Sequence, residues 1–138
     1  MKIAICTSFS FIKETVAIKD QLEKMGHIVF IPHNAELYAN GTLAPETRKE
    51  STQNKIAGNL IARYYNIIND CDAILVVNKD KYDFKNYIGG NTFLEMGFAH
   101  VLNKKIFLLN AVPEEMLYSD EILAMPHIII NNDLNKIA

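Results

Sequence analysis

The sequence contains few of the residues that bind metals or form disulfides. It has only two cysteines, Cys6 and Cys71, and they do not form a CxxC pair. Its four histidines fall at no metal-ligand spacing. We therefore expect reduced, buried thiols in a cytoplasmic protein, with no metal and no cofactor.

No hydrophobic run is long, and no charge of one sign dominates. The N-terminal apolar run covers only Ile3–Thr7, which is too short for a signal peptide or a membrane span. With 14 basic and 16 acidic residues the formal net charge is −2, whereas a phosphate-backbone binder normally shows a basic face. The densest basic stretch, 79–85, has Asp80 and Asp83 between its lysines, which is typical of a solvated loop. We expect neither a membrane nor a nucleic acid as partner.

Apolar runs of strand length alternate with helical patterns along the chain. The run "DAILVVN" (72–78) is continuously apolar, as in a central parallel strand covered on both faces. Residues 34–50 are polar and predict a long connection, of the kind that often covers a site. The predicted strands are 2–7, 27–32, 72–78, 104–110 and 127–131; the predicted helices are 15–25, 51–72, one starting near Thr92, and a short one around 114–125.

This alternation predicts an α/β fold with a parallel sheet and helices on both faces, in a single domain spanning 1–138. For about five strands the default is the flavodoxin-like three-layer sandwich with strand order 2-1-3-4-5. Its ligand crevice lies between strands one and three, outside their carboxyl ends. The residues expected there are Thr7, Ser8, Phe9 and Ser10 after the first strand, and Asn78, the loop 79–91 and the next helix's start after the third.

Glu95 stands at the start of that helix among apolar neighbours, in "NYIGGNTFLEMGFAH" (86–100). A structural interpretation is a capping box, in which Thr92 is the N-cap and Glu95 bonds back to its amide. A functional interpretation is a first-turn carboxylate, kept ionised by the helix dipole and free amides and suited to attack an anomeric carbon. The two interpretations are compatible, because Glu95 can leave its cap when a ligand enters.

The residues just before Glu95 suit a ligand site. Gly89 and Gly90 allow the backbone to approach a ligand closely, and Asn91 and Thr92 offer polar groups beside them. We therefore expect all four to contact substrate.

The stretch "GGNTFLEMGFAHVLNKKIFLL" (89–109) resembles the signature of the nucleoside 2-deoxyribosyltransferase-like superfamily. Members typically show a strand, a glycine-containing loop, a helix reading Glu-x-Gly-x-Ala, and then a lysine and an isoleucine leading into the next strand. The matching residues are Glu95, Gly97, Ala99, Lys105 and Ile106. The resemblance covers residues 70–110 well and the first strand weakly.

The resemblance implies a flavodoxin-like fold and N-glycosidic chemistry on a nucleoside or nucleoside monophosphate. Glu95 would be the nucleophile toward C1′; the base would leave, and water or another base would complete the reaction. Ser8, Phe9 and Ser10 would touch the sugar or phosphate. Many members are homo-oligomers with sites near subunit contacts, so we expect a homo-oligomer here.

Three features depart from the family pattern. Active members usually carry an aspartate on the helix before the third strand, where an ungapped count places Tyr64. A tyrosine common in the first strand of hydrolase members is missing, and Thr7 replaces the usual glycine after that strand. A divergent catalytic set could draw on the loop residues Asp80, Tyr82, Asp83 or Tyr87, although loop charges and tyrosines usually face solvent or pack on neighbours.

Two functions from different classes are therefore open. One is an enzyme that hydrolyses or transfers the N-glycosidic bond through Glu95, which the intact helix start favours. The other is a module that binds a nucleotide or a related small molecule without turnover, which the missing aspartate favours. The sequence does not specify the base or the sugar.

Overall fold

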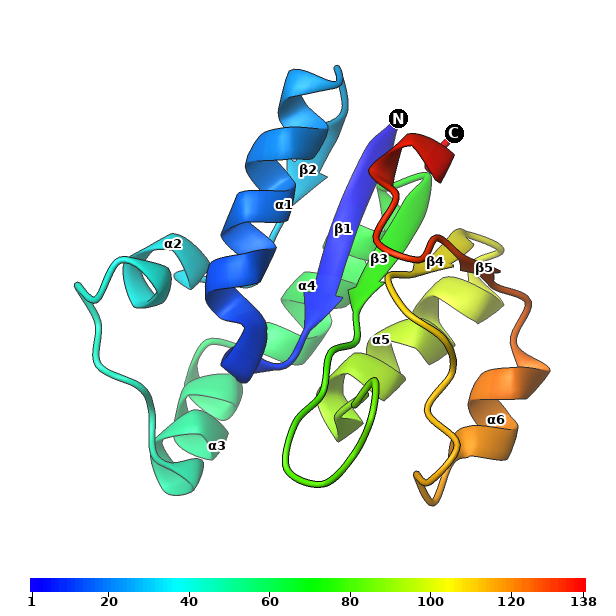
Figure 1. Cartoon of the computed structure of the whole chain (residues 1–138). Coiled ribbons are helices and arrows are strands. Elements are labelled where there is room, and N and C mark those ends of the chain that lie inside the picture. The colour runs from blue at the N-terminus through cyan, green and yellow to red at the C-terminus, as the bar shows by residue number, and fades with distance from the viewer.

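The computed structural model describes residues 1–138, and five parallel strands form its middle layer. The strands are β1 (Lys2–Thr7), β2 (Ile28–Phe30), β3 (Ala73–Val77), β4 (Lys105–Leu108) and β5 (Ile128–Ile129). They lie in the order β2-β1-β3-β4-β5, and every neighbouring pair is parallel (Figure 1). This confirms the predicted order and its switch point between β1 and β3.

Helices cover both faces of the sheet (Figure 1). On one face lies α1 (Ile12–Lys24), which follows the 3₁₀ turn η1 (Phe9–Phe11), together with the C-terminal turn η2 (Leu134–Lys136). On the other lie α4 (Leu60–Asn69), α5 (Gly90–Val101) and α6 (Ser119–Ala124). Successive residues of β1 and β3 enter opposite apolar clusters, which explains why both strands read as continuous apolar runs.

The segment between β2 and β3 differs most from the prediction. The connection 34–50 contains α2 (Ala35–Ala39) and the start of α3 (Arg48–Ala57), and the predicted single helix 51–72 is two helices, α3 and α4. The break falls at Asn59, whose φ of 48° is left-handed. A right-handed helix does not continue through such a residue, and asparagine is one of the few side chains that tolerate it.

The edge strands are shorter than predicted. β2 covers three residues of the predicted 27–32, and β5 covers two of the predicted 127–131. Both lie at the edges of the sheet and pair on one side only, so fewer backbone hydrogen bonds hold their ends. The two ends of the chain lie near each other at the amino edge of the sheet, away from the carboxyl ends of the strands (Figure 1).

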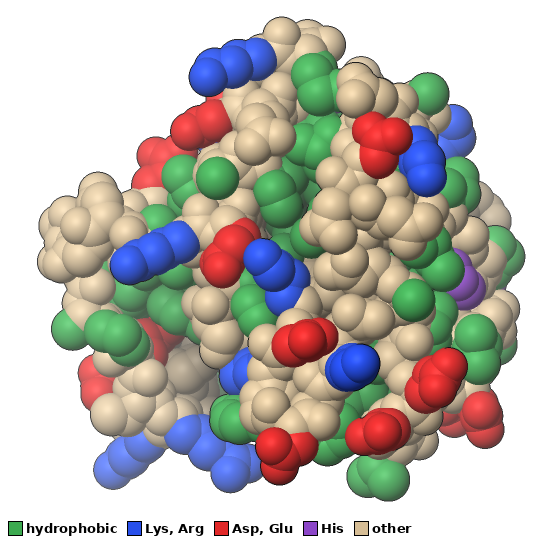
Figure 2. Space-filling view, in the orientation of Figure 1, with side chains coloured by type: hydrophobic (Ala, Val, Ile, Leu, Met, Phe, Trp, Pro, Cys, Tyr) green, Lys and Arg blue, Asp and Glu red, His purple; other side chains and the backbone are tan.

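The surface shows mixed charge. Lys and Arg side chains are interspersed with Asp and Glu side chains over the face seen in Figure 2. None of the helices combines the length and hydrophobicity that a membrane crossing requires.

Asn78 links the carboxyl ends of β3 and β4. Its fully buried side-chain amide donates to the carbonyl oxygens of Asn110 at 3.0 Å and Ala111 at 2.9 Å, and its Oδ1 accepts from the Asn110 backbone N–H at 2.9 Å. The Asn110 side chain returns a bond to the Asn78 carbonyl at 2.9 Å. Because these bonds use its polar atoms within the protein, Asn78 is not part of the site proposed below.

We expect Asn78→Ala to lower the free energy of unfolding by about 2–4 kcal/mol, because it leaves buried backbone groups without partners. Equilibrium urea denaturation with an unchanged m-value measures the loss. Asn69→Ala, at an exposed position with no side-chain bond in the structure, is the control and should change stability by less than about 0.5 kcal/mol. A similar, small effect at both positions would contradict the structural role of Asn78.

Candidate active site

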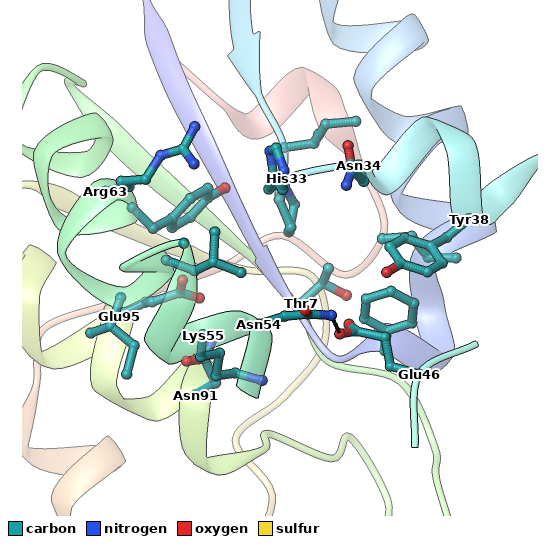
Figure 3. A pocket seen from close by; sticks show the side chains of 18 of the residues that line it. Thr7, His33, Asn34, Tyr38, Glu46, Asn54, Lys55, Arg63, Asn91 and Glu95 are labelled. Atoms are coloured by element: carbon teal, nitrogen blue, oxygen red, sulfur yellow. Dashed lines mark hydrogen bonds between the residues drawn. The ribbon is translucent and has the colours of Figure 1, made fainter. Parts of the chain in front are cut away.

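A cleft lies over the carboxyl ends of β1 and β3, at the switch point of the sheet. It consists of an inner cavity of about 480 Å³ that contains Glu95, and an outer cavity of about 770 Å³ in front of the start of α5. The two cavities adjoin through the residues that line both: Thr7, Phe9, Ile12, Tyr38, Glu46, Lys55 and Asn91. Figure 3 shows the side chains of the inner cavity.

The structure brings nearly all of the sequence-predicted site residues together. Glu95 lines the inner cavity. The other predicted residues that line the outer cavity are Thr7, Ser8, Phe9, Ser10, Gly89, Gly90, Asn91 and Thr92. Asn78 alone lies elsewhere, in the β3–β4 link described above.

The start of α5 differs from the predicted capping box. The helix begins at Gly90 with Gly89 as its N-cap, and Thr92 lies buried within the first turn. No side chain caps this helix, so the first amides lack both an intrahelical acceptor and a capping acceptor. A Cβ placed on Gly90 would meet no atom within 4 Å, so the backbone there is open to the outer cavity.

Glu95 is the sixth residue of α5, in its second turn, and its side chain is directed into the inner cavity (Figure 3). Only 6% of the residue is exposed. Burial raises the pKa of Glu95 from its ordinary value of 4.5 to about 8, while hydrogen bonding with Cys6 and the charge of Lys55 act in the opposite direction. The expectation of a first-turn anion is therefore wrong: the dipole effect fades beyond the first turn, and burial favours the protonated acid in the free protein.

Two buried groups lie close to the Glu95 carboxyl. Cys6 comes from β1, and burial, together with the neighbouring Glu95 carboxyl, raises the pKa of its thiol well above the ordinary value. Tyr64 comes from α4, lines the inner cavity, and donates its hydroxyl hydrogen to the Ile5 carbonyl. Burial likewise raises the pKa of Tyr64, so both groups are neutral near pH 7. Tyr64 stands where the resemblance expects an aspartate, and it forms part of the cavity wall.

The loop after β3 contacts the outer cavity indirectly, through a bond from Lys81 to Ser8, while Lys81 itself lines neither cavity. The Lys81 ammonium donates to the Ser8 hydroxyl at 2.9 Å and lies 5.0 Å and 5.1 Å from the ring centroids of Tyr82 and Tyr87. The loop residues considered as divergent catalysts, Asp80, Tyr82, Asp83 and Tyr87, line neither the inner nor the outer cavity.

Sequence reasoning missed the wall that faces Glu95. It comes from the segment after β2 and from α3 and α4, and its polar side chains are His33, Asn34, Tyr38, Glu46, Asn54, Lys55 and Arg63 (Figure 3). Within it the Asn54 amide donates to the Glu46 carboxylate, and Phe9 packs edge-on against Tyr38 with ring centroids 4.4 Å apart. The sequence signal for this wall was the long polar connection 34–50, which indicated that a segment covers the site but not which of its side chains line it.

No protein-family model matches the chain, and a search of curated proteins also found no match. Among solved structures, the chain is similar to the 2-deoxyribosyltransferase of Bacillus psychrosaccharolyticus, with a TM-score of 0.62 and 20% identity over 94% of this chain and 85% of the other. It is also similar to a Clostridium botulinum CMP N-glycosidase, with a TM-score of 0.51 and 20% identity over 95% and 90%. At this identity the similarities establish a shared fold, in agreement with the resemblance seen in the sequence.

The polar groups of the cleft suit an organic ligand. No group of three or more His, Cys, Asp or Glu side chains lies close enough together to hold a metal ion. The cleft combines one carboxyl in an apolar setting, a helix start with open amides and a polar wall. Such a set can attack an electrophilic carbon, hold an anionic or hydroxylated group, and contact a polar ring.

Proposed function

We propose that the protein breaks the N-glycosidic bond of a nucleoside or nucleoside monophosphate, with Glu95 as the nucleophile. The observation that carries the proposal is a single, almost buried carboxyl that opens into a cavity at the switch point of the sheet. Two proteins that share the fold, a 2-deoxyribosyltransferase and a CMP N-glycosidase, act in this class of chemistry by name.

The proposed reaction proceeds in two steps. The ionised Glu95 oxygen bonds to C1′, the C1′–N bond breaks, and its electron pair leaves with the base, which takes up a proton. Water then attacks the glycosyl ester and releases the sugar, or a second base attacks and a new nucleoside forms. Because the pKa of Glu95 is about 8, kcat/KM should rise with pH as the carboxyl ionises.

The outer cavity fits the 5′ side of the sugar. Open amides in the first turn of α5 attract oxygen anions, and the helix dipole adds to that attraction. The Ser8 and Ser10 hydroxyls line the same cavity, and Lys81 bonds to Ser8. We therefore propose that a 5′-monophosphate, where present, lies here, with the base toward the polar wall of the inner cavity.

Release of free base tests the proposal. The protein is incubated with ribo- and deoxyribonucleosides and their 5′-monophosphates, and the free base is measured by chromatography. We expect release from at least one class, and a lower KM for the monophosphate than for the matching nucleoside. Adding a second base to the reaction separates transfer from hydrolysis, because transfer yields a new nucleoside.

The second candidate function is nucleotide binding without turnover. Two features favour binding without turnover. The cavity wall has Tyr64 on α4 where the resemblance expects a carboxylate, and burial favours the protonated form of Glu95 in the free protein. In that case no base is released, and a nucleotide raises the melting temperature in proportion to its occupancy.

A further inference from the structure

Lys55 is a cation within the cleft that the sequence analysis did not consider. It lies on α3 and lines both the inner and the outer cavity, close to Asn91 in Figure 3. Its ammonium donates to the hydroxyl of Ser51, one turn earlier on the same helix, at 2.5 Å. The residue is half-buried, so its charge acts where water is partly excluded.

Lys55 forms no ion pair with a surface carboxylate. The three ion pairs of the structure lie elsewhere, namely Lys19–Glu23, Lys19–Glu36 and Lys79–Glu14. Two carboxyls line the inner cavity with it, Glu46 and Glu95, and Glu46 accepts a hydrogen bond from Asn54. Neither carboxyl has a cationic partner in the structure, and Glu95, which has no such hydrogen bond from Asn54, is the one that is almost fully buried.

The elements packed around Glu95 present few groups that can stabilise its charge. The titratable or charged groups that face the inner cavity or the carboxyl are Cys6 of β1, His33 of the segment after β2, Tyr38 of α2, Glu46 of the segment before α3, Lys55 of α3, and Arg63 and Tyr64 of α4. The thiol and the phenols are neutral near pH 7. The positive charge of Lys55 lowers the pKa of Glu95, against the effect of burial.

A ligand in the cleft would strengthen the effect of Lys55 on Glu95. None of the residues of α3 is buried, and its main packing partner is α4. A sugar and base in the cleft would exclude water between Lys55 and Glu95, which strengthens the attraction between an ammonium and a carboxylate.

We propose that Lys55 is a positioning residue that stabilises the carboxylate of Glu95 when that side chain ionises, supplying from α3 a positive charge to the cavity that both residues line. This inference rests on the proposed function, since it assigns Lys55 a part in the attack by Glu95. Lys55 itself forms no bond to the reacting carbon.

The test compares Lys55→Met with Lys55→Arg and with Lys49→Met, an exposed lysine on the same helix that lines neither cavity. The Glu95 carboxyl is titrated in the ligand-free protein by ¹³C NMR, with its signal assigned from its absence in Glu95→Gln. We expect Lys55→Met to raise the pKa of Glu95 by ~0.5–1 unit, and the other two variants to leave it nearly unchanged. No shift in Lys55→Met would overturn the proposal, whether or not the protein is an enzyme.

Kinetics supply the second measurement, with an unphosphorylated nucleoside as substrate. The pH profile of kcat/KM for Lys55→Met should shift to higher pH by the same amount as the pKa of Glu95. Activity should then fall about three- to tenfold at pH 7 and approach that of the wild type near pH 10. A loss confined to the KM of phosphorylated substrates would instead make Lys55 a phosphate ligand and refute the inference. Absence of base release in the wild type would refute the proposed function but not the inference about Lys55, because the NMR titration tests the effect of Lys55 on Glu95 without any substrate.

Discussion

Glu95→Gln should reduce base release by at least roughly 10³-fold while the protein stays folded. Glutamine has nearly the same shape as a protonated glutamic acid, so it fits the buried site, but its amide cannot bond to C1′. The loss should appear in kcat rather than in KM, because the cavity that binds the substrate is unchanged. Initial rates on the best substrate of the base-release panel measure it.

The matched control is Glu121→Gln, an exposed glutamate on α6 that lines neither cavity. It should retain full activity, which shows that loss of a negative charge alone does not matter. A Glu95→Gln variant with more than about a tenth of the wild-type rate would mean that another group attacks the sugar.

Most of the sheet could be predicted because its signals are local. The central strands β1 and β3 are buried on both faces, so each is a continuous apolar run that needs no knowledge of its partners. Strand order follows from the alternation of strands and helices and from the handedness of crossovers. The break at Asn59 escaped prediction because a left-handed asparagine leaves no pattern in hydrophobic spacing, whereas the apolar residues on both sides of it suggested one helix.

The site was predictable to the extent that topology determines it. The residues after β1 and at the start of α5 meet at the switch point in any sheet of this order, and these are the residues that line the cleft. The opposite wall, from His33 to Arg63, depends on how α2 and α3 fold back over the sheet. That path is set by tertiary packing and by surface residues, which carry no periodic signal.

The charge of Glu95 was mispredicted for a related reason. Thr92 and Glu95 match a capping box by spacing alone, but the helix starts two residues before Thr92. The ionisation of Glu95 depends on burial and on contacts from β1 and α3, which a local pattern does not contain. The topology of the sheet predicts where Glu95 lies, whereas the groups packed around it determine whether its carboxyl is protonated.

We expect Glu95→Gln to stabilise the protein at high pH and to leave its stability almost unchanged at low pH. Burial raises the pKa of Glu95 in the folded protein to about 8, from an ordinary value of 4.5 that also describes the unfolded chain. Between these two values the folded state retains a proton that the unfolded state has released, so the wild type loses stability as pH rises. Below about pH 4.5 both states are protonated, and the penalty disappears.

Glutamine cannot ionise, so it removes this penalty. One pKa unit corresponds to about 1.4 kcal/mol, which makes the full effect a few kcal/mol and the rise in melting temperature at pH 9 about 5–10 °C. Thermal unfolding of Glu95→Gln and wild type from pH 4.5 to 9 measures it, and taking the difference between the two proteins cancels the titration of all other groups. Glu121→Gln should show no such trend, because the Glu121 side chain stays exposed to water in the folded protein. If the melting temperatures of Glu95→Gln and wild type change in parallel with pH, burial does not oppose the ionisation of Glu95. If they diverge as pH rises, Glu95 lowers the stability of the protein, as is common for residues that are retained for their chemistry.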